Sequence, residues 1–366
     1  MFDRSKLNIK PLAARHHKLE IEKIAVTPDS HRGVLPGKVD QQILALAERI
    51  KSARKAFKPV ILTYGAHLIK NGLAPVVNKL IEDGWITHIA TNGAGSIHDW
   101  EFAYLGKSTE DVRANTAVGE FGTWEETGKY INLAVAAGGI KGEGYGASIG
   151  NLILKDGIEL PPVEYIKERI IELSSQQCVG EELGALSDLL YVMTAFGLNE
   201  SIVVKHPYKQ FSVQYTASKY NIPFTIHPGI GYDIIYTHPM NCGGAIGRGS
   251  VWDFLIYAES ISKLSGGVHI TVGSAIMAPM IFEKALSMSN NVALQKNGVP
   301  LSDYYLAVVD IQDGGDWDWS QGEPPMENPA YYLRFCKTFY RMGGTLDYIC
   351  LDNRQFMLRL CEILSK

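Results

Sequence analysis

The sequence lacks most features that would place a protein outside the ordinary globular class. It has five cysteines in 366 residues, an odd number without a CxxC pair, which suits a reducing cytosol and no structural disulfides. Cys350 and Cys361 stand in apolar, helix-like context, where a small buried side chain is expected. No run reaches the roughly 18 apolar residues of a membrane helix, and the N-terminal residues have no signal-type apolar segment. We therefore expect a cytoplasmic protein without a membrane partner.

The sequence also has no large excess of positive or negative charge. The chain has 35 basic and 39 acidic residues, for a net charge of -4, and its densest basic run, residues 51–58, resembles the solvated end of a helix. Nucleic acid and anionic membrane surfaces therefore have no electrostatic footprint in the sequence. Hydrophobic residues make up 46% of the chain, which is enough for one large core.

Short apolar runs alternate with helical patterns after an irregular beginning. Residues 1–37 are polar and contain three prolines, so we interpret them as an N-terminal arm, followed by a single α/β domain over residues 38–366. The alternation predicts a Rossmann-like, mostly parallel sheet with helices on both faces. The predicted strands are 59–64, 85–90, 201–205, 224–227, 267–272 and 305–310, and the predicted helices are 39–57, 68–83, 211–220, 251–264, 279–287 and 329–341.

A glycine-bearing turn, residues 91–96 (TNGAGS), follows the second predicted strand and precedes a helix that we expect to begin at His98 or Asp99. Free backbone N–H groups and the helix dipole favour a phosphate at such a place, and glycines let the backbone approach a ligand closely. The spacing is not GxGxxG, so a tight turn without a ligand remains the alternative.

Polar residues follow two further predicted strands. Asp313 and Asp316 could hold a ribose, a cation or an amine, or simply belong to a solvated loop. His227, Asp233 and His238 follow another strand, and histidine with carboxylate suits acid/base work or a metal. The fixed spacing of an HExxH motif is missing, and lone histidines more often have structural roles. His98, Asp99 and Glu101 add further titratable groups to the same predicted edge.

Five short motifs occur in a set order between Asp40 and Arg341. Their order and spacing resemble those of deoxyhypusine synthase. This resemblance implies a Rossmann-like fold, an NAD cofactor, a small-molecule substrate and a homotetramer with sites between subunits. The motifs are residues 65–106 with their two turns, Ser148-Ile149-Gly150-Asn151-Leu152, residues 215–223 (YTASKYNIP), Gly231-Tyr232-Asp233 through His238, and Asp313-Gly314-Gly315-Asp316.

The resemblance also implies roles for single positions and shows departures. Asp233 and Asp316 match acidic cleft positions of the family. The family's lysine, which carries the butylimine, is missing from the matching residues 273–280 (GSAIMAPM), and no lysine stands between Lys263 and Lys284. Because an apolar side chain cannot form a Schiff base, deoxyhypusine synthesis is not expected. The positions that would line an NAD site are Asn92, Gly93, Ala94, Gly95 and Asp313.

Three functions remain open, since a fold does not fix a function. The first is a transferase or oxidoreductase that uses NAD or a related nucleotide on a small amine or amino acid. The second is a metal-dependent hydrolase or lyase, and the third is a non-catalytic nucleotide-binding protein. For the first, the acid/base candidates are His98, Asp99, Asp233 and His238, with Glu101 and Asp316 toward the substrate. For the second, the metal ligands would be His227, Asp233, His238 and Asp313.

Overall fold

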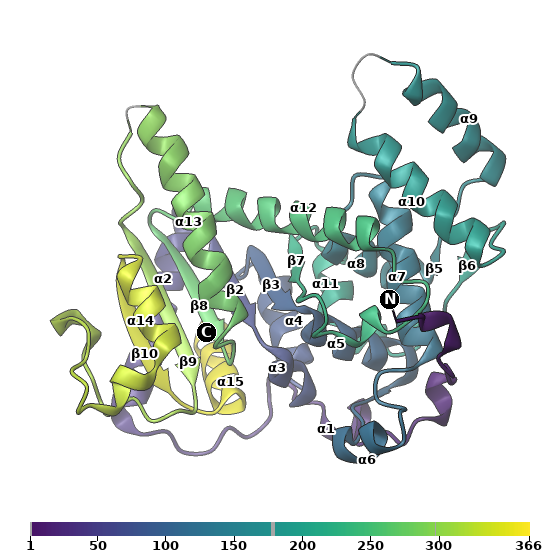
Figure 1. Cartoon of the computed structure of the whole chain (residues 1–366). Helices are drawn as coiled ribbons and strands as arrows, with labels where there is room; N and C mark the ends of the chain where they lie inside the picture. The colour runs from purple at the N-terminus through teal and green to yellow at the C-terminus, as the bar shows by residue number, and fades with distance from the viewer. Residues whose placement is uncertain (1, 177–179, 297) are drawn as a thin grey trace.

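A six-stranded parallel sheet forms the centre of the molecule (Figure 1). The computed structural model describes residues 2–176, 180–296 and 298–366. The sheet has the spatial order β10-β9-β8-β2-β3-β7, and every pair of neighbours is parallel. The predicted fold class, a mostly parallel sheet with helices on both faces, is confirmed. The strands are β2 (Val60–Tyr64), β3 (His88–Asn92), β7 (Phe224–His227), β8 (Gly267–Val272), β9 (Tyr304–Asp310) and β10 (Thr345–Cys350).

The order of these strands is that of a Rossmann fold. Counted along the chain from β2, the six strands lie in the spatial order 6-5-4-1-2-3, which is the order 3-2-1-4-5-6 of dinucleotide-binding sheets viewed from the other side. The strand β2 is therefore central, and the chain winds outward from it toward β7 and then from β8 toward β10.

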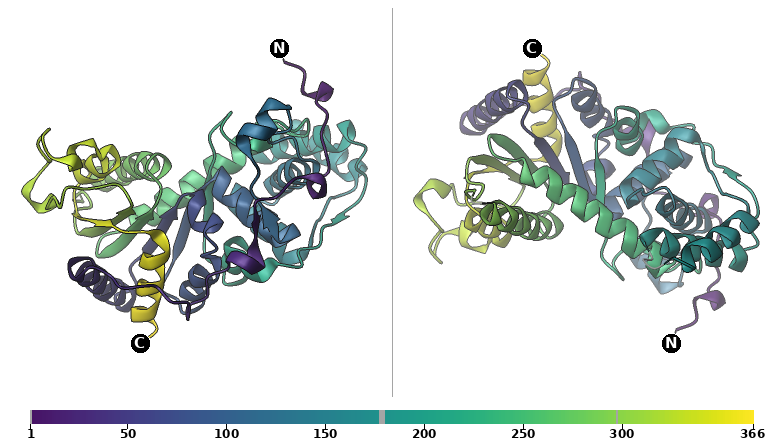
Figure 2. Two further views of the ribbon diagram at one scale, coloured as in Figure 1. Left: turned by 90° about the horizontal axis from the view of Figure 1, so that it is seen from below. Right: turned by 90° about the horizontal axis from the view of Figure 1, so that it is seen from above.

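The central strands are apolar on both sides, and this explains why helices cover both faces of the sheet. All five residues of β2 are buried. Leu62 and Tyr64 pack in the larger core, whereas Ile61 packs in the second core across the sheet. Since neighbouring side chains of a strand point to opposite faces, such a strand is stable only between two helical layers. Figure 2 shows helices on both sides of the sheet.

One face of the sheet is covered by helices from both ends of the chain, and the other by helices from its later part. Most buried residues of α2 (Gly37–Lys55), α4 (Ala74–Glu82) and α15 (Asn353–Leu364) belong to the larger core. Most of those of α13 (Met277–Gln295) and α14 (Arg334–Arg341) belong to the second, to which α12 (Gly243–Ser262) adds Tyr257 and Ile261.

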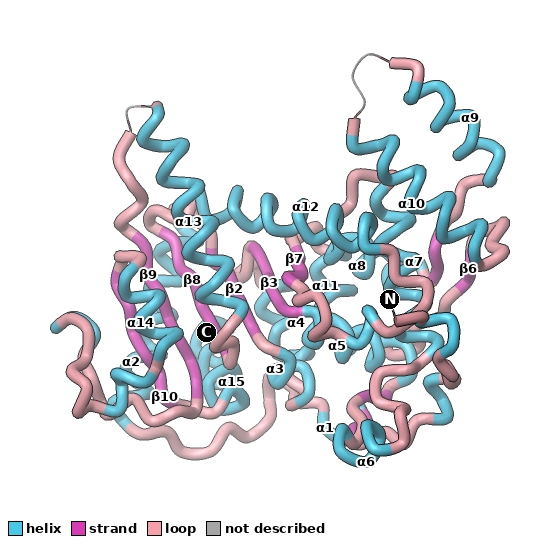
Figure 3. Tube along the Cα trace, in the orientation of Figure 1, coloured by secondary structure: helices cyan, strands magenta, loops and turns pink. Residues whose placement is uncertain are grey.

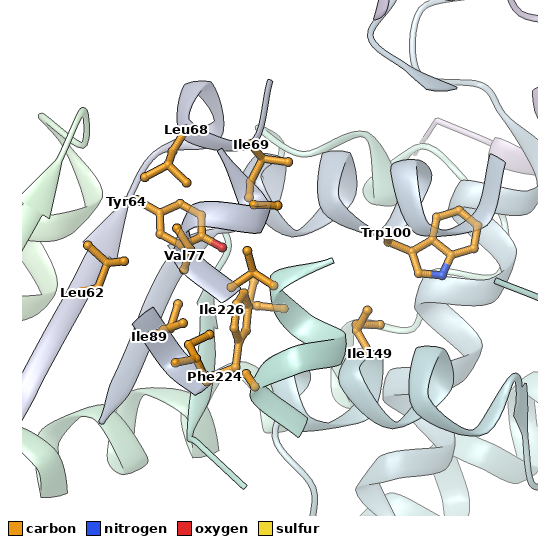
Figure 4. Close-up of a cluster of buried hydrophobic side chains, with 14 of the residues drawn as sticks. Leu62, Tyr64, Leu68, Ile69, Val77, Ile89, Trp100, Ile149, Phe224 and Ile226 are labelled. Atoms are coloured by element: carbon orange, nitrogen blue, oxygen red, sulfur yellow. The ribbon is translucent and has the colours of Figure 1, made fainter. Parts of the chain in front are cut away.

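A helical lobe continues the larger core beyond β7 (Figure 3). Figure 4 shows apolar side chains running from Leu62 of β2 past Phe224 of β7 to Trp100 and Ile149 in this lobe. The shared core joins the lobe to the sheet. Its helices are α5 (Gly93–Leu105), α6 (Val112–Ala117), α7 (Glu125–Gly139), α8 (Tyr145–Lys155), α9 (Val163–Ser174), α10 (Glu181–Ala195) and α11 (Val213–Lys219).

Three local predictions are wrong. The strand expected at 201–205 is only β6 (Ile202–Val203), which pairs antiparallel with β5 (Gly157–Ile158) outside the main sheet. Val203 is 71% exposed, so this segment cannot be a central strand. The helix expected from His98 or Asp99 begins at Gly93. Cys350 ends β10 and is exposed rather than buried in a helix.

The predicted helix over 68–83 is interrupted where the N-terminal arm crosses it. It forms α3 (Ala66–Lys70) and α4, separated at Gly72. Gly72 has φ +74, and a Cβ there would overlap the carbonyl of Ile24 in α1 (Ile21–Ile24) of the arm. The arm also forms β1 (Leu19–Glu20), which pairs with β4 (Lys107–Ser108). Among the described helices, none is both long and apolar enough to cross a bilayer.

Candidate functional site

The carboxyl ends of the six strands meet at one edge of the sheet, because all of the strands are parallel. At this edge β2 and β8 are neighbours, and the chain leaves them in opposite directions across the sheet. Open α/β sheets bind their ligands in the crevice outside such a point. The turns that follow the two strands begin with Gly65 and Gly273.

The backbones of these two turns are in direct contact. The N–H of Gly65 donates to the carbonyl of Val272 at 3.1 Å, and a Cβ on Gly65 would overlap the carbonyl oxygen of Gly273. Gly273 itself has φ +58, and no atom lies within 4 Å of the place that a Cβ would take. The N-terminus of α13 follows at Met277. Open space next to a helix N-terminus suits the phosphates of a dinucleotide.

The predicted phosphate turn, residues 91–96, is the beginning of α5. The side chain of Asn92 caps this helix by accepting the N–H of Gly95 at 2.8 Å. A Cβ on Gly95 would overlap the Thr91 hydroxyl, and a Cβ on Gly93 would overlap the carboxylate of Asp233. These residues therefore serve the close packing of the β3–α5 turn. Cofactor binding by Asn92, Gly93, Gly95 and the neighbouring Ala94 stays a prediction.

A cavity of about 180 Å³ opens beside the beginning of α5. Its walls come from α3, α5, α6, the loop after β7 and the N-terminal arm. It gathers four residues that the sequence predicted for the site, Ala94, His98, Glu101 and Asp233. Its charged and imidazole side chains are those of Arg15, Lys70, His98, Glu101, Glu110 and Asp233.

His98 is held by a short chain of hydrogen bonds. Its Nδ1 lies 2.8 Å from the hydroxyl of Ser108, which in turn donates to Oε2 of Glu101 at 2.5 Å. An ionised carboxylate can only accept, so the Ser108 hydroxyl is used as the donor to Glu101 and accepts the proton of Nδ1. The second ring nitrogen of His98 then carries a lone pair. Burial lowers the pKa of His98 to about 4, so the ring is neutral at pH 7 and its free nitrogen can accept a hydrogen bond.

Glu101 is kept ionised by the N-terminal arm. Both of its oxygens accept from the guanidinium of Arg15, at 2.9 and 2.6 Å, and Thr127 donates to it at 2.9 Å. Burial pushes the pKa of Glu101 upward, but the charge and hydrogen bonds of Arg15 outweigh burial and hold it below its usual value. Glu101 lines the cavity with its oxygens already occupied, and its predicted contact with a substrate stays a prediction.

Asp233 is the carboxylate of the cavity with the fewest donors. Its Oδ2 accepts one hydrogen bond, from the backbone N–H of Gly229 at 3.2 Å. Burial raises the pKa of Asp233 to about 6, so its charge changes near physiological pH. A raised carboxyl pKa in a cavity is typical of groups that bind or transfer protons.

Lys70, at the end of α3, gives the cavity a positive charge. Among the described residues, its ammonium has no ion-pair partner, whereas Arg15 pairs with Glu101 and lies 3.8 Å from Glu110. The helix α3 begins at the β2 turn, so it links the crevice between β2 and β8 to the cavity. The site thus offers an ammonium, a carboxylate and a neutral imidazole to one small ligand.

Asp99, predicted as an acid/base residue, does not line the cavity. It accepts hydrogen bonds from the Ser212 hydroxyl, the backbone N–H groups of Val213 and Gln214, and the Gln214 side chain. These backbone groups begin α11, so Asp99 caps a neighbouring helix. Burial raises the pKa of Asp99, although these hydrogen bonds oppose the rise.

Other predicted residues also lie outside the cavity lining. His238 contacts Glu125 at 3.2 Å and accepts the N–H of Met240. Asp313 accepts from its neighbour Gly315 on the loop after β9. Asp316, on the same loop, is exposed and pairs with Lys38. The roles predicted for these three residues stay predictions.

The ligand set of the metal hypothesis is not assembled. The half-buried His227 packs against Tyr257, with a ring separation of 5.4 Å, whereas Asp233 alone of the four lines the cavity. Among the described residues, no group of three or more histidines, cysteines and carboxylates is placed to hold a metal ion. The sequence hypothesis of a site made from His227, Asp233, His238 and Asp313 is therefore not supported by this geometry.

Three residues of the site, Arg15, Lys70 and Ser108, were missed by the sequence prediction. Arg15 stands in the segment interpreted as an N-terminal arm, although the nearby Leu12 is fully buried. Lys70 and Ser108 occupy ordinary-looking positions. A lone arginine beside apolar residues in the arm was the one available signal, because a buried arginine needs a carboxylate partner.

No family model and no curated protein matches the chain. A solved structure of a conserved LOR/SDH protein from Methanococcus maripaludis S2 is similar over 93% of this chain and 73% of its own, with 15% identity and a TM-score of 0.46.

Two longer proteins also have similar structures. The cyanobacterial arginine dihydrolase ArgZ shows 16% identity over 89% of this chain, with a TM-score of 0.41. AgrE, solved with ornithine and NAD+, shows 14% identity over 91% of this chain, with a TM-score of 0.42. The chain spans 33% of the first protein and 34% of the second. The Rossmann-like fold of this protein rests on its own strand order.

Proposed function

We propose that the protein is an enzyme that binds NAD or a related dinucleotide in the crevice between β2 and β8 and acts on a small amine or amino acid in the adjoining cavity. The observation that carries the proposal is the position of the cavity. It opens beside the carboxyl edge of a sheet with dinucleotide-binding strand order, and α3 contributes to both places.

The cavity complements a zwitterion. The carboxylate of Asp233 would hold the substrate ammonium, and the ammonium of Lys70 would hold a substrate carboxylate. The free nitrogen of His98 would accept a hydrogen bond from the substrate ammonium. A nicotinamide cofactor supplies a hydride acceptor when it is bound, and the protein orients the reacting carbon toward it.

This proposal excludes the covalent route of deoxyhypusine synthase. In the structure, residues 273–280 form the turn after β8 and the beginning of α13. The side chains of this turn include no amine, so a Schiff base cannot form there. Membership of that family stays a prediction based on the five motifs.

Thermal unfolding with and without NAD tests the dinucleotide site, because a ligand that binds only the native state raises the Tm. We expect a rise that is lost in Asn92→Ala or Asp313→Ala. Asp318→Ala is a matched control on the same loop as Asp313. No rise with NAD or other dinucleotides would overturn the dinucleotide proposal.

The substrate is tested in a second step, with a panel of amines and amino acids and the NADH absorbance as the readout. Turnover that is lost in His98→Gln and Asp233→Asn would support the enzyme proposal. Tight NAD binding without turnover of any compound would instead favour a non-catalytic nucleotide-binding protein.

A further inference from the structure

The N-terminal arm contributes a buried guanidinium to the cavity described above. Arg15 is 5% exposed, although the arm around it is largely irregular. Its two terminal nitrogens make a two-pronged ion pair with Glu101, and its Nε contacts Nδ1 of His17 at 3.3 Å. Figure 1 shows the arm running beneath the helical lobe before it crosses to α2. The site therefore joins residue 15 to residues more than eighty positions later.

The direction of the hydrogen-bond chain depends on the charge of Glu101. When Glu101 is ionised it only accepts, so the Ser108 proton points at Glu101 and the Ser108 lone pair accepts the Nδ1 proton of His98. A protonated Glu101 would donate to Ser108 instead. The Ser108 hydroxyl would then donate to Nδ1, and the proton of His98 would move to Nε2.

Arg15 decides between these two states, because Glu101 lies fully buried and a buried carboxylate without a partner takes up a proton. The other charged or titratable groups that act on His98 are Lys70 and His67 of α3, and both disfavour its protonation, as does Arg15. None of them can orient the Ser108 hydroxyl. The ion pair between the arm and α5 is therefore the part of the site that fixes the tautomer.

We infer that Arg15 is a positioning residue: through Glu101 and Ser108 it holds the His98 proton on Nδ1 and leaves Nε2 with the lone pair that can accept a hydrogen bond. The inference rests on the proposed role of His98 as an acceptor for the substrate. It makes the arm an integral part of the site rather than a tether.

The test is the nitrogen NMR spectrum of histidine-labelled full-length protein, with His98 assigned from the spectrum of His98→Gln. The two neutral tautomers give different patterns of nitrogen–carbon-bound-proton correlations. At pH 7 we expect His98 to be neutral, with its proton on Nδ1. A proton on Nε2, or a mixture of both tautomers, in the unmodified protein would overturn the inference without any variant.

Three variants separate positioning from stabilisation. Arg15→Met should move the proton of His98 to Nε2, and Arg15→Lys should restore part of the Nδ1 form because a single ammonium still neutralises Glu101. Ser108→Ala should give a mixture, because the chain is broken. Thr127→Val is the matched control: it removes another donor to Glu101 but leaves the chain to His98 intact, so the tautomer should not change.

The outcomes distinguish this inference from the proposed function. If Arg15→Met and Ser108→Ala keep the proton of His98 on Nδ1, Arg15 has only a structural role and the inference is wrong. If the tautomers behave as expected but no amine or amino acid is turned over, the positioning stands and the enzyme proposal fails.

Discussion

Asp99 of α5 and Asp233, which lies against Gly93 at the beginning of α5, differ in how completely their hydrogen bonds are satisfied. On the face toward α11, Asp99 accepts four hydrogen bonds and does not line the cavity described above. Asp233 has one donor, at 3.2 Å, and lines that cavity together with His98. A buried carboxylate with a full set of donors builds the fold. One with few donors in a cavity is available to a ligand, at a cost in stability.

The largest effect is predicted for the loss of the Asp99 carboxylate. Asp99→Ala leaves the Ser212 hydroxyl and the first N–H groups of α11 buried without acceptors, and each unsatisfied group costs about 1–3 kcal/mol. We expect the free energy of unfolding in urea to fall by more than about 3 kcal/mol. Asp111→Ala, which removes an exposed cap of α6, is the control and should have a much smaller effect. Equal losses would contradict the comparison.

Asp233→Asn should act in the opposite direction. Burial raises the pKa of Asp233 to about 6, so at pH 7 the folded protein holds a charge that would be more stable in water. Removing this charge should raise the free energy of unfolding at pH 7 by about 1–3 kcal/mol while abolishing turnover. A loss of stability in the same urea titration would show that the Asp233 charge has a structural role.

The pH dependence of substrate binding tests the role of the Asp233 charge. Below pH 6 Asp233 is protonated and loses its attraction for a substrate ammonium, so affinity should rise with pH through about 6. Calorimetric titration should show about a tenfold change per pH unit below that value. His98, with a pKa of about 4, stays neutral over this range. The profile of Asp233→Asn should be flat, and a profile that keeps its step would assign the step to another group.

Lys70→Met should weaken the binding of amino acids by about tenfold, which corresponds to about 1.4 kcal/mol. The matching amine that lacks a carboxylate should bind equally well to both proteins, because it does not use the ammonium of Lys70. Lys79→Met, on the surface of α4 and paired with Asp83, is the control. An equal loss for amine and amino acid would show that Lys70 does not read the carboxylate.

The smallest effect concerns the turn before α5. Asn92→Ala removes the side chain that caps the helix, and the loss of such a cap costs about 1 kcal/mol. We expect a fall of that size in the free energy of unfolding without NAD. If NAD raises the Tm of Asn92→Ala by as much as it raises that of the unmodified protein, Asn92 is a helix cap and has no part in the cofactor site.

The sequence predicted His98 and Asp99 for one site, and the helix explains why only one of them lies there. Consecutive residues of an α-helix point about 100° apart, whereas residues three apart share a face. His98 and Glu101 are three apart and meet through Ser108. Asp99 turns toward α11 instead. The prediction treated this stretch as a turn followed by a helix, although the helix begins at Gly93.

The parallel sheet was predictable because local sequence patterns indicate its strands and helices. Strands such as β2 are apolar at every position and alternate with helices along the chain, and such strands need cover on both faces. Strand pairing order is not local. The neighbours of β2 come from residues 88–92 and 267–272, and no periodicity within either segment specifies that contact.

Local patterns in the sequence therefore predict the fold class, and they single out Ala94, His98, Glu101 and Asp233, which the structure places around one cavity. Packing in three dimensions sets which of these side chains have free hydrogen-bonding atoms. Arg15 binds Glu101, which is 86 positions away in the chain. The Asp99 oxygens already accept hydrogen bonds from the beginning of α11. Whether a buried charge is paired or available depends on distant partners, because solvation and hydrogen bonding are properties of the packed neighbourhood.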